Sequence, residues 1–458
     1  MTTATITGQQ RRAARHARVR AALPGHLERR TWDAERIEAW QRDRLRALLR
    51  HAKAHSRFHA GRLAGVDPAR FELADLATLP TMTKAEMMAG LDRLVTDPRL
   101  SRAVLEGHLA ASAAEATELF GEYVVLASGG SSGERGVFVY GADAIVDYLL
   151  GLVRNGLARL LSVGEPPPGG VPMALVAAGS PIHPSRALAD LFSGDLLAVT
   201  SIPVTLPLPE IVARLNRARP VLLQGYPTVL SLLAEERAAG RLQVTPMAVT
   251  GSSEQFLPDA RARVAAAFGV PVVDQFGSAE GVLGTSAPDD ATIVLASDLA
   301  IVELVDERNR PVPPGTPSAK ALVTNLMNPT QPLIRYELTD RFVRQPAAAE
   351  HGHLRVTVEG RADDLLAYGG MVVHPLVLRS VLVDTPEVIE YQVTQTRRGA
   401  HVQVVAPGGV DRPALAARLA TALRGAGVHS AEVTVEPVAA IARHPDTGKS
   451  KRFLTRPA

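Results

Sequence analysis

The chain has 458 residues, more than one hydrophobic core usually organises, so we expect two or three domains. Hydrophobic residues make up 46% of the sequence and charged residues 21%, a balance that excludes a disordered or collagen-like chain. The formal net charge is only +3, and the absence of cysteine excludes disulfides, thiolate zinc sites and a cysteine nucleophile.

The basic residues crowd the amino terminus, where residues 1–50 hold twelve arginines against five acidic residues. Guanidinium groups there would suit phosphates, but an arginine-rich, solvated helix explains them as well. Aromatic residues make up only 4% of the chain and do not interleave with basic patches, so we do not expect a nucleic-acid partner.

The first twenty residues lack the apolar stretch of a signal peptide, and no run of about 18 uncharged apolar residues is present. The sequence therefore predicts a soluble, cytoplasmic protein with no membrane partner. It carries no signal that indicates an oligomeric state.

Residues 34–60 predict an amphipathic helix, because apolar residues recur at helical spacing with arginines on the other face. Farther along, Thr83 precedes Lys84, Ala85 and Glu86. This pattern is typical of a helix N-cap with an acidic first turn.

From about 120 to 335, short β-rich runs alternate with helix-like stretches, which predicts a mainly parallel sheet covered by helices on its faces. Ligands of such sheets bind beyond the carboxyl ends of the strands. Polar, glycine-rich segments follow strand-like runs after residues 178, 224, 250 and 275. We therefore expect four strand ends to line one crevice.

The segment 312–318 is a turn-rich connector, and four short runs after it predict antiparallel strands. The last hundred residues change to a strand-helix-strand-helix pattern. We place a domain boundary near residue 360, within "EGRADDLLAYGG".

A loop rich in glycine and serine, "ASGGSSGERG" at 127–136, lies between two strand-like runs. It lacks the Lys-Ser/Thr pair of a P-loop. Residues 129–133 match the G-x-S-x-G elbow of a serine hydrolase with Ser131 as nucleophile, but the β-like "VFVY" follows where an elbow needs a helix. Two interpretations of the loop are left. Its amides and hydroxyls could wrap a polyphosphate, or it could be a plain solvated turn.

Five further segments stand in the order of the motifs of the adenylate-forming superfamily, which includes acyl-CoA ligases and stand-alone adenylation enzymes. They are "FGSAEG" at 276–281, "LIRYELTD" at 333–340, "GRADD" at 360–364, "GGMVVHP" at 369–375 and "HPDTGKSKR" at 444–452. The chain resembles this superfamily over nearly its whole length after about residue 30. The amino-terminal region and "LVTNLMNPTQPLIRY" look like the phenylacetate-CoA ligase branch.

The resemblance implies an α/β fold with two domains. Residues 1–360 would form an ATP- and acid-binding domain of mainly parallel sheets flanked by helices, with a small β-barrel-like part. Residues 361–458 would form a small, mobile α+β domain that carries the catalytic lysine. Asp363 falls at the family's hinge, around which the small domain rotates.

Two carboxylates have implied roles at the nucleotide. Glu280 resembles the family's Mg²⁺ ligand, a hard oxygen suited to a hard cation beside phosphates, although a carboxylate at a helix start is the plain alternative. Asp340 occupies the position that accepts hydrogen bonds from the ribose hydroxyls. Arg361 resembles the residue that also reaches the ribose, or else forms a surface ion pair.

Lys449 resembles the lysine that bridges the α-phosphate and the substrate carboxylate during adenylation. The chain has five lysines against forty-five arginines, so lysine is not its default cation. A compact ammonium on a long stem suits that role better than a planar guanidinium. Lys84 is a second candidate for a phosphate contact, and a helix-surface lysine is the alternative.

The resemblance and the positions of the strand ends imply two further sets of site residues. The set expected to bind ATP and AMP is Ser128, Gly129, Gly130, Ser131, Ser132, Gly133, Gly251, Ser252, Ser253, Glu254, Gln275, Phe276, Gly277 and Ser278. The set expected to border the acid is Ala178, Gly179, His183, Tyr226 and Gly251.

The sequence also departs from the family pattern. Ala279 stands where the family commonly has threonine, Phe276 replaces tyrosine, and Leu338 and Thr339 replace commoner residues before Asp340. The hydroxyl contact to the α-phosphate is therefore missing or moved to Ser278. These changes indicate a divergent member.

Our hypothesis is an ATP- and Mg²⁺-dependent ligase that adenylates a small, aromatic carboxylic acid, releases pyrophosphate and transfers the acyl group to a thiol, with coenzyme A as the expected acceptor. Alternatives are a carrier-protein thiol or an amine in a biosynthetic pathway, or activation of an unusual oxyacid. A serine hydrolase using Ser131 is the alternative from a different class.

Overall fold

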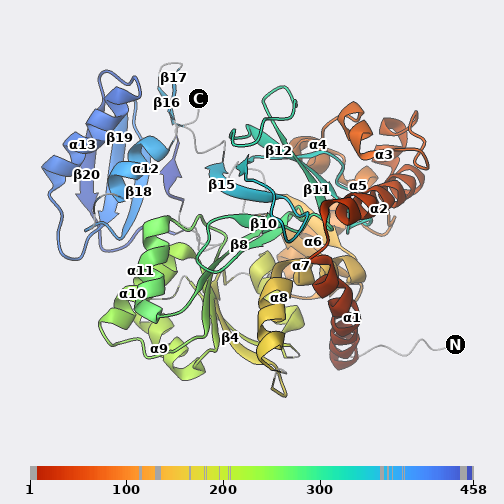
Figure 1. The fold of residues 1–458 in the computed structure, drawn as a ribbon, viewed down its shortest axis with the longest axis horizontal. Coiled ribbons are helices and arrows are strands. Elements are labelled where there is room, and N and C mark those ends of the chain that lie inside the picture. The colour runs from red at the N-terminus through yellow and green to blue at the C-terminus, as the bar shows by residue number, and fades with distance from the viewer. Residues whose placement is uncertain are drawn as a thin grey trace.

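The structure is a computed structural model that describes most of the chain (Figure 1). The described residues are 8–112, 116–128, 136–164, 167–179, 181, 183–194, 196–204, 206, 208–361, 366–368, 371–373, 375–383, 385, 387–443 and 451–455. Within these ranges, no helix combines the length and the apolar character that a membrane span requires.

A helical region opens the chain. The amphipathic helix expected over 34–60 is α2, which ends at His55 because Ser56 caps a separate helix, α3. Asp33 caps the start of α2 by accepting a hydrogen bond from the Arg36 amide. The arginine-rich segment before it is also a helix, α1, but it is not wholly solvated, because Val19, Leu23 and His26 are buried. The elements are α1 (Gly8–Arg29), α2 (Ala34–His55), α3 (Arg57–Arg62), η1 (Leu73–Thr78), α4 (Lys84–Ala89), α5 (Leu91–Leu94) and α6 (Arg102–Ala111).

Thr83 caps α4, as its sequence predicts. The Thr83 hydroxyl accepts a hydrogen bond from the Glu86 amide, and the Glu86 carboxylate accepts one from the Thr83 amide in return. This reciprocal pair satisfies two amides that the first helical turn leaves without partners. It places Lys84 at the start of the helix.

The glycine- and serine-rich loop connects two antiparallel strands. Strand β2 pairs with β3 so that Ala127 lies opposite Val137, and residues 129–135 between them lie outside the described residues. A strand follows the loop, so its context is that of a hairpin and not of a hydrolase elbow. The elements are β1 (Glu118–Leu119), β2 (Tyr123–Ala127), β3 (Val137–Tyr140) and the long helix α7 (Ala142–Val163).

The centre of the molecule is a nine-stranded sheet in the order β14-β15-β10-β9-β8-β7-β6-β4-β5. The five strands from β8 to β5 are parallel, and helices connect them, as the alternating sequence pattern predicts. This part consists of β4 (Val171–Ala177), α8 (Pro184–Phe192), β5 (Leu197–Pro203), α9 (Leu208–Ala218), β6 (Leu222–Gly225), α10 (Pro227–Ala238), β7 (Ala248–Ser252), α11 (Pro258–Phe268) and β8 (Val272–Gly277).

The other half of this sheet is antiparallel, and a separate three-stranded antiparallel sheet lies beside it. The strands expected after the connector at 312–318 are present, although the last two join the large sheet. The large sheet continues with β9 (Leu283–Ser286), β10 (Ile293–Leu295), β14 (Asp340–Arg344) and β15 (Arg355–Arg361); the small one holds β11 (Ala300–Val305), β12 (Lys320–Asn325) and β13 (Tyr336–Leu338).

The carboxyl-terminal part is a four-stranded sheet in the order β20-β19-β18-β21, which packs with two helices around its own apolar core (Figure 1). Strand β15 continues to Arg361, so the proposed boundary at 360 falls one residue before its end. The elements are β16 (Leu366–Tyr368), β17 (Met371–Val373), α12 (Leu376–Val383), β18 (Glu390–Gln395), β19 (Gly399–Val405), α13 (Arg412–Gly425), β20 (Glu432–Pro437) and β21 (Phe453–Leu454).

Candidate active site

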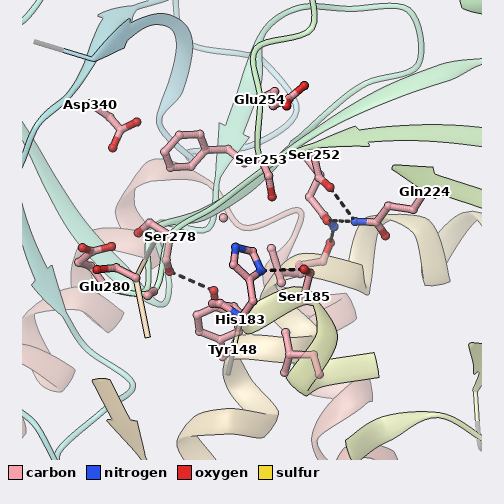
Figure 2. A pocket seen from close by; sticks show the side chains of 18 of the residues that line it. Tyr148, His183, Ser185, Gln224, Ser252, Ser253, Glu254, Ser278, Glu280 and Asp340 are labelled. Atoms are coloured by element: carbon pink, nitrogen blue, oxygen red, sulfur yellow. Dashed lines mark hydrogen bonds between the residues drawn. The ribbon is translucent and has the colours of Figure 1, made fainter. Parts of the chain in front are cut away.

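A cavity of about 740 Å³ lies where the parallel strands β6, β7 and β8 reach their carboxyl ends. In open α/β sheets this edge is where ligands bind. Residues named from distant sequence motifs meet here (Figure 2). The predicted site residues in its lining are Lys84, Ser128, His183, Ser252, Ser253, Glu254, Gln275, Phe276, Gly277, Ser278, Glu280 and Asp340.

Glu280 lies in the tight loop between β8 and β9, and its side chain is buried in the cavity wall. Tyr336 Oη lies 3.5 Å from Glu280 Oε1, and Asn325 Nδ2 donates a hydrogen bond of 2.9 Å to the Glu280 carbonyl. Gly281 follows with φ +97°, where a Cβ atom would lie 2.3 Å from Asn325 Nδ2. Only glycine fits that position, so Gly281 and Asn325 together fix Glu280.

Two buried tyrosines hold the same loop from the other side. Tyr140 Oη donates to the Ala279 carbonyl at 2.6 Å, and Tyr148 Oη donates to the Ser278 carbonyl at 3.0 Å. Burial raises the pKa of both phenols, and the Glu280 carboxylate raises it further. The tyrosines therefore stay protonated donors and keep the loop in place.

Glu280 can supply only part of the oxygen ligands that a Mg²⁺ ion needs. Among the described residues, no group of three or more His, Cys, Asp or Glu side chains is placed to hold a metal ion. Mg²⁺ is commonly held by one or two protein carboxylates together with substrate phosphates and water. A single buried carboxylate is therefore sufficient on the protein side only if a polyphosphate supplies further oxygens.

An amide network forms the wall at the ends of β6, β7 and β8. Gln224 Nε2 donates to Gln275 Oε1 at 2.7 Å and lies 3.3 Å from Ser252 Oγ, while Gln275 Nε2 donates to the Leu152 carbonyl at 2.9 Å (Figure 2). The two amides are thereby held in defined orientations. They line the cavity with polar groups suited to a heterocyclic base.

Glu254 follows β7 and binds the first turn of α10. Its Oε2 atom accepts hydrogen bonds from the Thr228 hydroxyl at 2.7 Å and the Thr228 amide at 3.2 Å. Ser253 before it has φ +66°, a strained left-handed conformation for a residue with a side chain. Strain of this kind, held by the surrounding contacts, is frequent at ligand sites.

Asp340, Lys84 and Ser128 border the cavity from elements outside the parallel strands. Asp340 begins β14 and is buried; its register partner on β15 is Arg361. Lys84 enters from the start of α4. Ser128 closes the neck of the glycine-serine loop, where its Oγ accepts a hydrogen bond of 2.8 Å from the Gly136 amide.

His183 stands at the amino terminus of α8 between the polar wall and an apolar part of the cavity (Figure 2). Its Nδ1 atom lies 2.9 Å from Ser185 Oγ, which orients the ring. Four other described residues expected at the acid do not line the cavity: Ala178, Gly179, Tyr226 and Gly251. Tyr226 Oη instead accepts a hydrogen bond from the Ala178 amide at 3.0 Å.

Beyond His183 the cavity continues into a lobe with apolar walls, which we call the acyl lobe. Its walls are formed by α1, α7, β4, α8 and β5 together with the turn before β5. The apolar residues of these segments that line it are Val19, Leu149, Leu150, Leu152, Val153, Leu157, Met173, Leu175, Leu188, Ala189, Phe192, Leu196, Leu197 and Val199.

Several predicted site residues lie outside the described residues. For Arg361 the structure describes the backbone pairing with Asp340. The residues outside are Gly129, Gly130, Ser131, Ser132, Gly133, Asp363 and Lys449. Their roles stay predictions.

Several residues of the lining were not predicted from the sequence, among them Gln224, Asp274, Tyr148 and Arg379. Burial raises the pKa of Asp274 to about 6, although the Arg261 guanidinium opposes the shift. Gln224 and Asp274 stand at or near the ends of strands that the sequence pattern did predict. Tyr148 and Arg379 carry no such signal, because they reach the site from the middle of α7 and from α12.

Comparison with known proteins identifies the fold. No family model and no curated protein sequence matches the chain. The structure resembles that of 2-hydroxyisobutyryl-CoA ligase in the postadenylation state in complex with R3-HIB-AMP, with a TM-score of 0.69 and 20% identity over 93% of this chain and 91% of that one. The amide bond synthetase McbA from Marinactinospora thermotolerans matches with a TM-score of 0.50 and 17% identity over 71% of this chain and 67% of that one.

A second structure of the same CoA ligase matches with a lower TM-score. Against the same CoA ligase in the thioesterification state, in complex with 2-HIB-AMP and CoA, the TM-score is 0.52 at 20% identity, again over 93% of this chain and 91% of that one. From its sheet order, its motif-lined cavity and these likenesses, the chain has the fold of the adenylate-forming CoA ligases and adenylation enzymes.

Proposed function

We propose that the protein is an ATP-dependent ligase that joins a carboxylic acid to AMP and then transfers the acyl group to a thiol, with coenzyme A as the acceptor. What supports this function is that residues from separate motifs line one cavity with a polar part and an apolar part. A nucleotide and an apolar acid would then meet at their boundary, beside His183 and Ser278.

In the first step a carboxylate oxygen of the acid attacks the α-phosphorus of ATP, and pyrophosphate leaves. Asp340 and Arg361 would hold the ribose, while Gln275 and the segment 251–254 would border adenine. His183 would orient the carboxylate at the mouth of the acyl lobe. Alignment of two anions is the main demand of such a step.

Glu280 and Lys84 would meet the phosphates, together with the loop that begins at Ser128. A Mg²⁺ ion held by Glu280 and phosphate oxygens would neutralise the charge that develops on pyrophosphate. Lys449 would bridge the α-phosphate and the acid. In the second step the thiolate attacks the acyl carbonyl carbon and AMP leaves.

The carboxyl-terminal part, residues 361–458, would be the mobile domain, with Asp363 as its hinge. Contacts of the described residues support this assignment, because polar side chains join this part to the large part. Arg379 Nη1 donates to Gln255 Oε1 at 2.6 Å, and Arg443 Nη1 lies 3.2 Å from Thr228 Oγ1. A rotation would break a few hydrogen bonds and leave the carboxyl-terminal apolar core intact.

The phenylacetate-CoA ligase-like branch and a cytoplasmic location remain parts of this proposal. The acceptor has alternatives, namely a carrier-protein thiol or an amine, and the likeness to an amide bond synthetase keeps the amine among them. An unusual oxyacid is the alternative for the acid. A hydrolase that uses Ser131 has little support, because β3 follows its loop.

ATP–pyrophosphate exchange over a panel of acids tests the first step, and acyl transfer with and without coenzyme A tests the second. We expect acid-dependent exchange, and thioester formation only with coenzyme A. Lys449→Ala should abolish exchange while preformed acyl-adenylate still reacts with the thiol. Lys53→Ala removes a lysine from α2, outside the cavity lining, and should change neither step.

Absence of exchange with every acid would overturn the proposal. Ester hydrolysis that Ser131→Ala abolishes would restore the hydrolase. Equal loss of both steps in Lys449→Ala would contradict the role given to that lysine.

A further inference from the structure

The acyl lobe has a defined depth because three of its walls, α7, β4 and α8, run along one common axis. Helix α7 ends where the connection to β4 begins, and α8 starts after the carboxyl end of β4. Both helices therefore run antiparallel to β4. We call the end beside Tyr148, His183 and Ser278 the upper end (Figure 2). Leu157 and Phe192 also line the lobe and stand farther along α7 and α8, toward what we call the lower end.

Each wall gives nearly the same depth. From Tyr148 to Leu157, α7 rises by about 13 Å at about 1.5 Å per residue. From the end of β4 at Ala177 down to Met173, the strand spans about 13 Å at about 3.3 Å per residue. Helix α8 descends by about 12 Å between Pro184 and Phe192.

The lower half of the lobe is apolar. Among the described residues of α7, β4, α8 and β5 that line the lobe, none is Asp, Glu, Lys or Arg; α1 adds His16 to the lining beside Val19. The polar groups His183, Ser185 and Tyr148 are all at the upper end. A ligand that fills the lobe would thus have one polar end, directed at Ser278, and an apolar remainder.

Some leucines and valines in the lining are only half-buried. Leu149 and Val153 lie one helical turn apart on the same face of α7, and Leu157 continues that face. Leu196 and Leu197 are also half-buried at the lower end. A bound apolar chain would cover this surface.

We infer that the acid is a long-chain apolar one, with a flexible tail of about ten carbons beyond the carboxylate, because an extended chain of 1.5 Å bonds advances about 1.3 Å per carbon. This inference rests on the proposed function. It replaces the small aromatic acid expected from the sequence, since benzoate or phenylacetate would leave the lower half of the lobe unfilled.

The rate of exchange with straight-chain acids from propanoate to hexadecanoate measures the depth. Each methylene that enters the lobe should raise kcat/KM by about fourfold, the factor that corresponds to burying one CH₂ group. The rise should stop near ten to twelve carbons, where the tail reaches Leu157 and Met173. A kcat/KM for benzoate or phenylacetate equal to or above that for decanoate would overturn the inference.

Val153 lies about half-way along α7, so the size of its side chain should set how long an acyl chain the lobe can hold. Val153→Phe should lower the optimum by about four carbons and leave butanoate unchanged, because about 6 Å of the depth lies below this residue. Val153→Ala should leave the optimal chain length of the acid unchanged or increase it. Ser162→Phe places the same ring at an exposed position of α7 outside the lining and should not move it.

Failure of the inference and failure of the function are distinguishable. Exchange that is independent of chain length, or equal losses for all acids in Val153→Phe, would refute the long tail while adenylation stands. If no acid supports exchange, calorimetric titration of decanoate and benzoate into the full chain decides the matter. Tighter binding of decanoate, weakened in Val153→Phe, would support the lobe, and no binding would refute it.

Discussion

Arg443 Nη1 lies 3.2 Å from Thr228 Oγ1, the same hydroxyl that donates to Glu254 at the edge of the nucleotide part of the cavity. Arg443 Nη2 lies 3.3 Å from Glu390 Oε1 on β18. Arg443 is the last described residue before 444–450, the segment that contains Lys449. One guanidinium thus joins the carboxyl-terminal part to the site immediately before the proposed catalytic lysine.

Arg443→Ala should lower the rate of ATP–pyrophosphate exchange by tenfold or more, because a hydrogen bond to a charged group contributes about 1.5–3 kcal/mol. Transfer from preformed acyl-adenylate to the thiol should change little, since that step uses a different domain arrangement in our proposal. Arg398→Ala removes an exposed arginine paired with Glu432 in the same part of the chain and should leave both rates unchanged. Equal losses in both steps would instead indicate a general structural role for Arg443.

Glu390 should make stability depend on pH. Burial raises the pKa of its carboxyl from 4.5 to about 7, although Arg443 opposes the shift. The protonated form favours folding, so its stabilising contribution is full below pH 4.5 and is lost as pH rises through about 7. The wild-type protein should therefore lose about 2.5 kcal/mol of its free energy of unfolding between pH 5 and 8 from this group, at 1.36 kcal/mol per pKa unit.

Glu390→Gln removes that titration. Its free energy of unfolding, measured by urea denaturation at several pH values, should fall less than that of the wild type between pH 5 and 8. Glu432→Gln changes an exposed carboxylate of β20 and should keep the wild-type slope. Parallel pH profiles for Glu390→Gln and the wild type would contradict the raised pKa.

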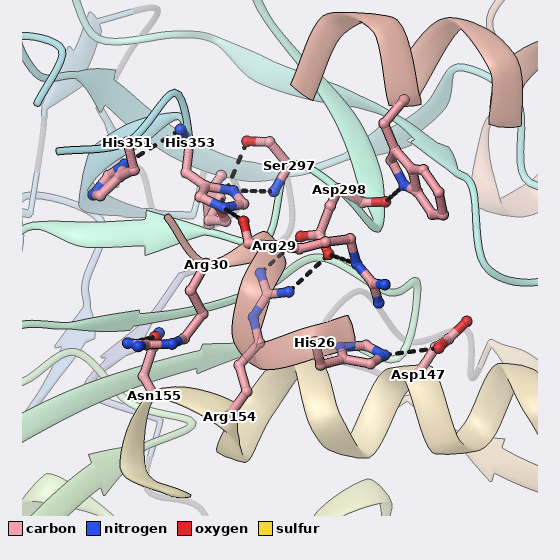
Figure 3. Close-up of polar contacts among 12 residues, drawn as sticks. His26, Arg29, Arg30, Asp147, Arg154, Asn155, Ser297, Asp298, His351 and His353 are labelled. Carbon is pink, nitrogen blue, oxygen red and sulfur yellow. Dashed lines mark hydrogen bonds and ion pairs between the residues drawn. The ribbon is translucent and has the colours of Figure 1, made fainter. Parts of the chain in front are cut away.

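Asp298 lies between two arginines from the helices α1 and α7 and is almost completely buried (Figure 3). Its oxygens accept hydrogen bonds of 2.7 Å from Arg154 Nη1 and Nη2 and 2.8 Å from Arg29 Nε. Burial alone would raise the pKa of this carboxyl, but the arginines hold it well below its usual range. The contact ties α1 to α7 beside the acyl lobe.

Asp298→Ala should lower the free energy of unfolding by about 3–5 kcal/mol, because it leaves the Arg154 charge buried and without its carboxylate. Asp306→Ala breaks an exposed ion pair with Arg310, together with hydrogen bonds from the Arg308 and Arg310 amides, and should cost much less. Chemical denaturation of the two variants provides the comparison. Similar losses in both would mean that the buried network does not stabilise the fold.

Gly281→Ala should abolish exchange by displacing Glu280, since the added Cβ would lie 2.3 Å from Asn325 Nδ2. Gly315→Ala is the control: its φ is also positive, at +78°, but nothing lies within 4 Å of the added atom. Both changes carry the backbone cost of about 1–2 kcal/mol for a left-handed residue, so a loss of exchange confined to Gly281→Ala isolates the effect on Glu280. Full exchange in Gly281→Ala would show that Glu280 is not needed.

Local patterns in the sequence were sufficient for several features. Thr83 and Glu86 form the cap that their spacing predicts, and the alternation of strands and helices from β4 to β8 follows the hydrophobic period. The polar residues after β7 and β8 were expected at one edge because parallel strands share their carboxyl ends. These predictions succeed because each depends on residues close together in the chain.

Local sequence was sufficient to predict the alternating strands and helices from β4 to β8 and the polar residues at their ends, because hydrophobic period and polarity are local properties. Tertiary structure alone decided the acyl lobe, since Val153 and Met173 read as ordinary core residues until the distance between α7 and β4 is known. It also decided that Asp298 meets Arg29 across 269 residues and that Arg443 meets Thr228 across 215. Such pairings depend on how whole elements pack, and no short stretch of sequence contains that information.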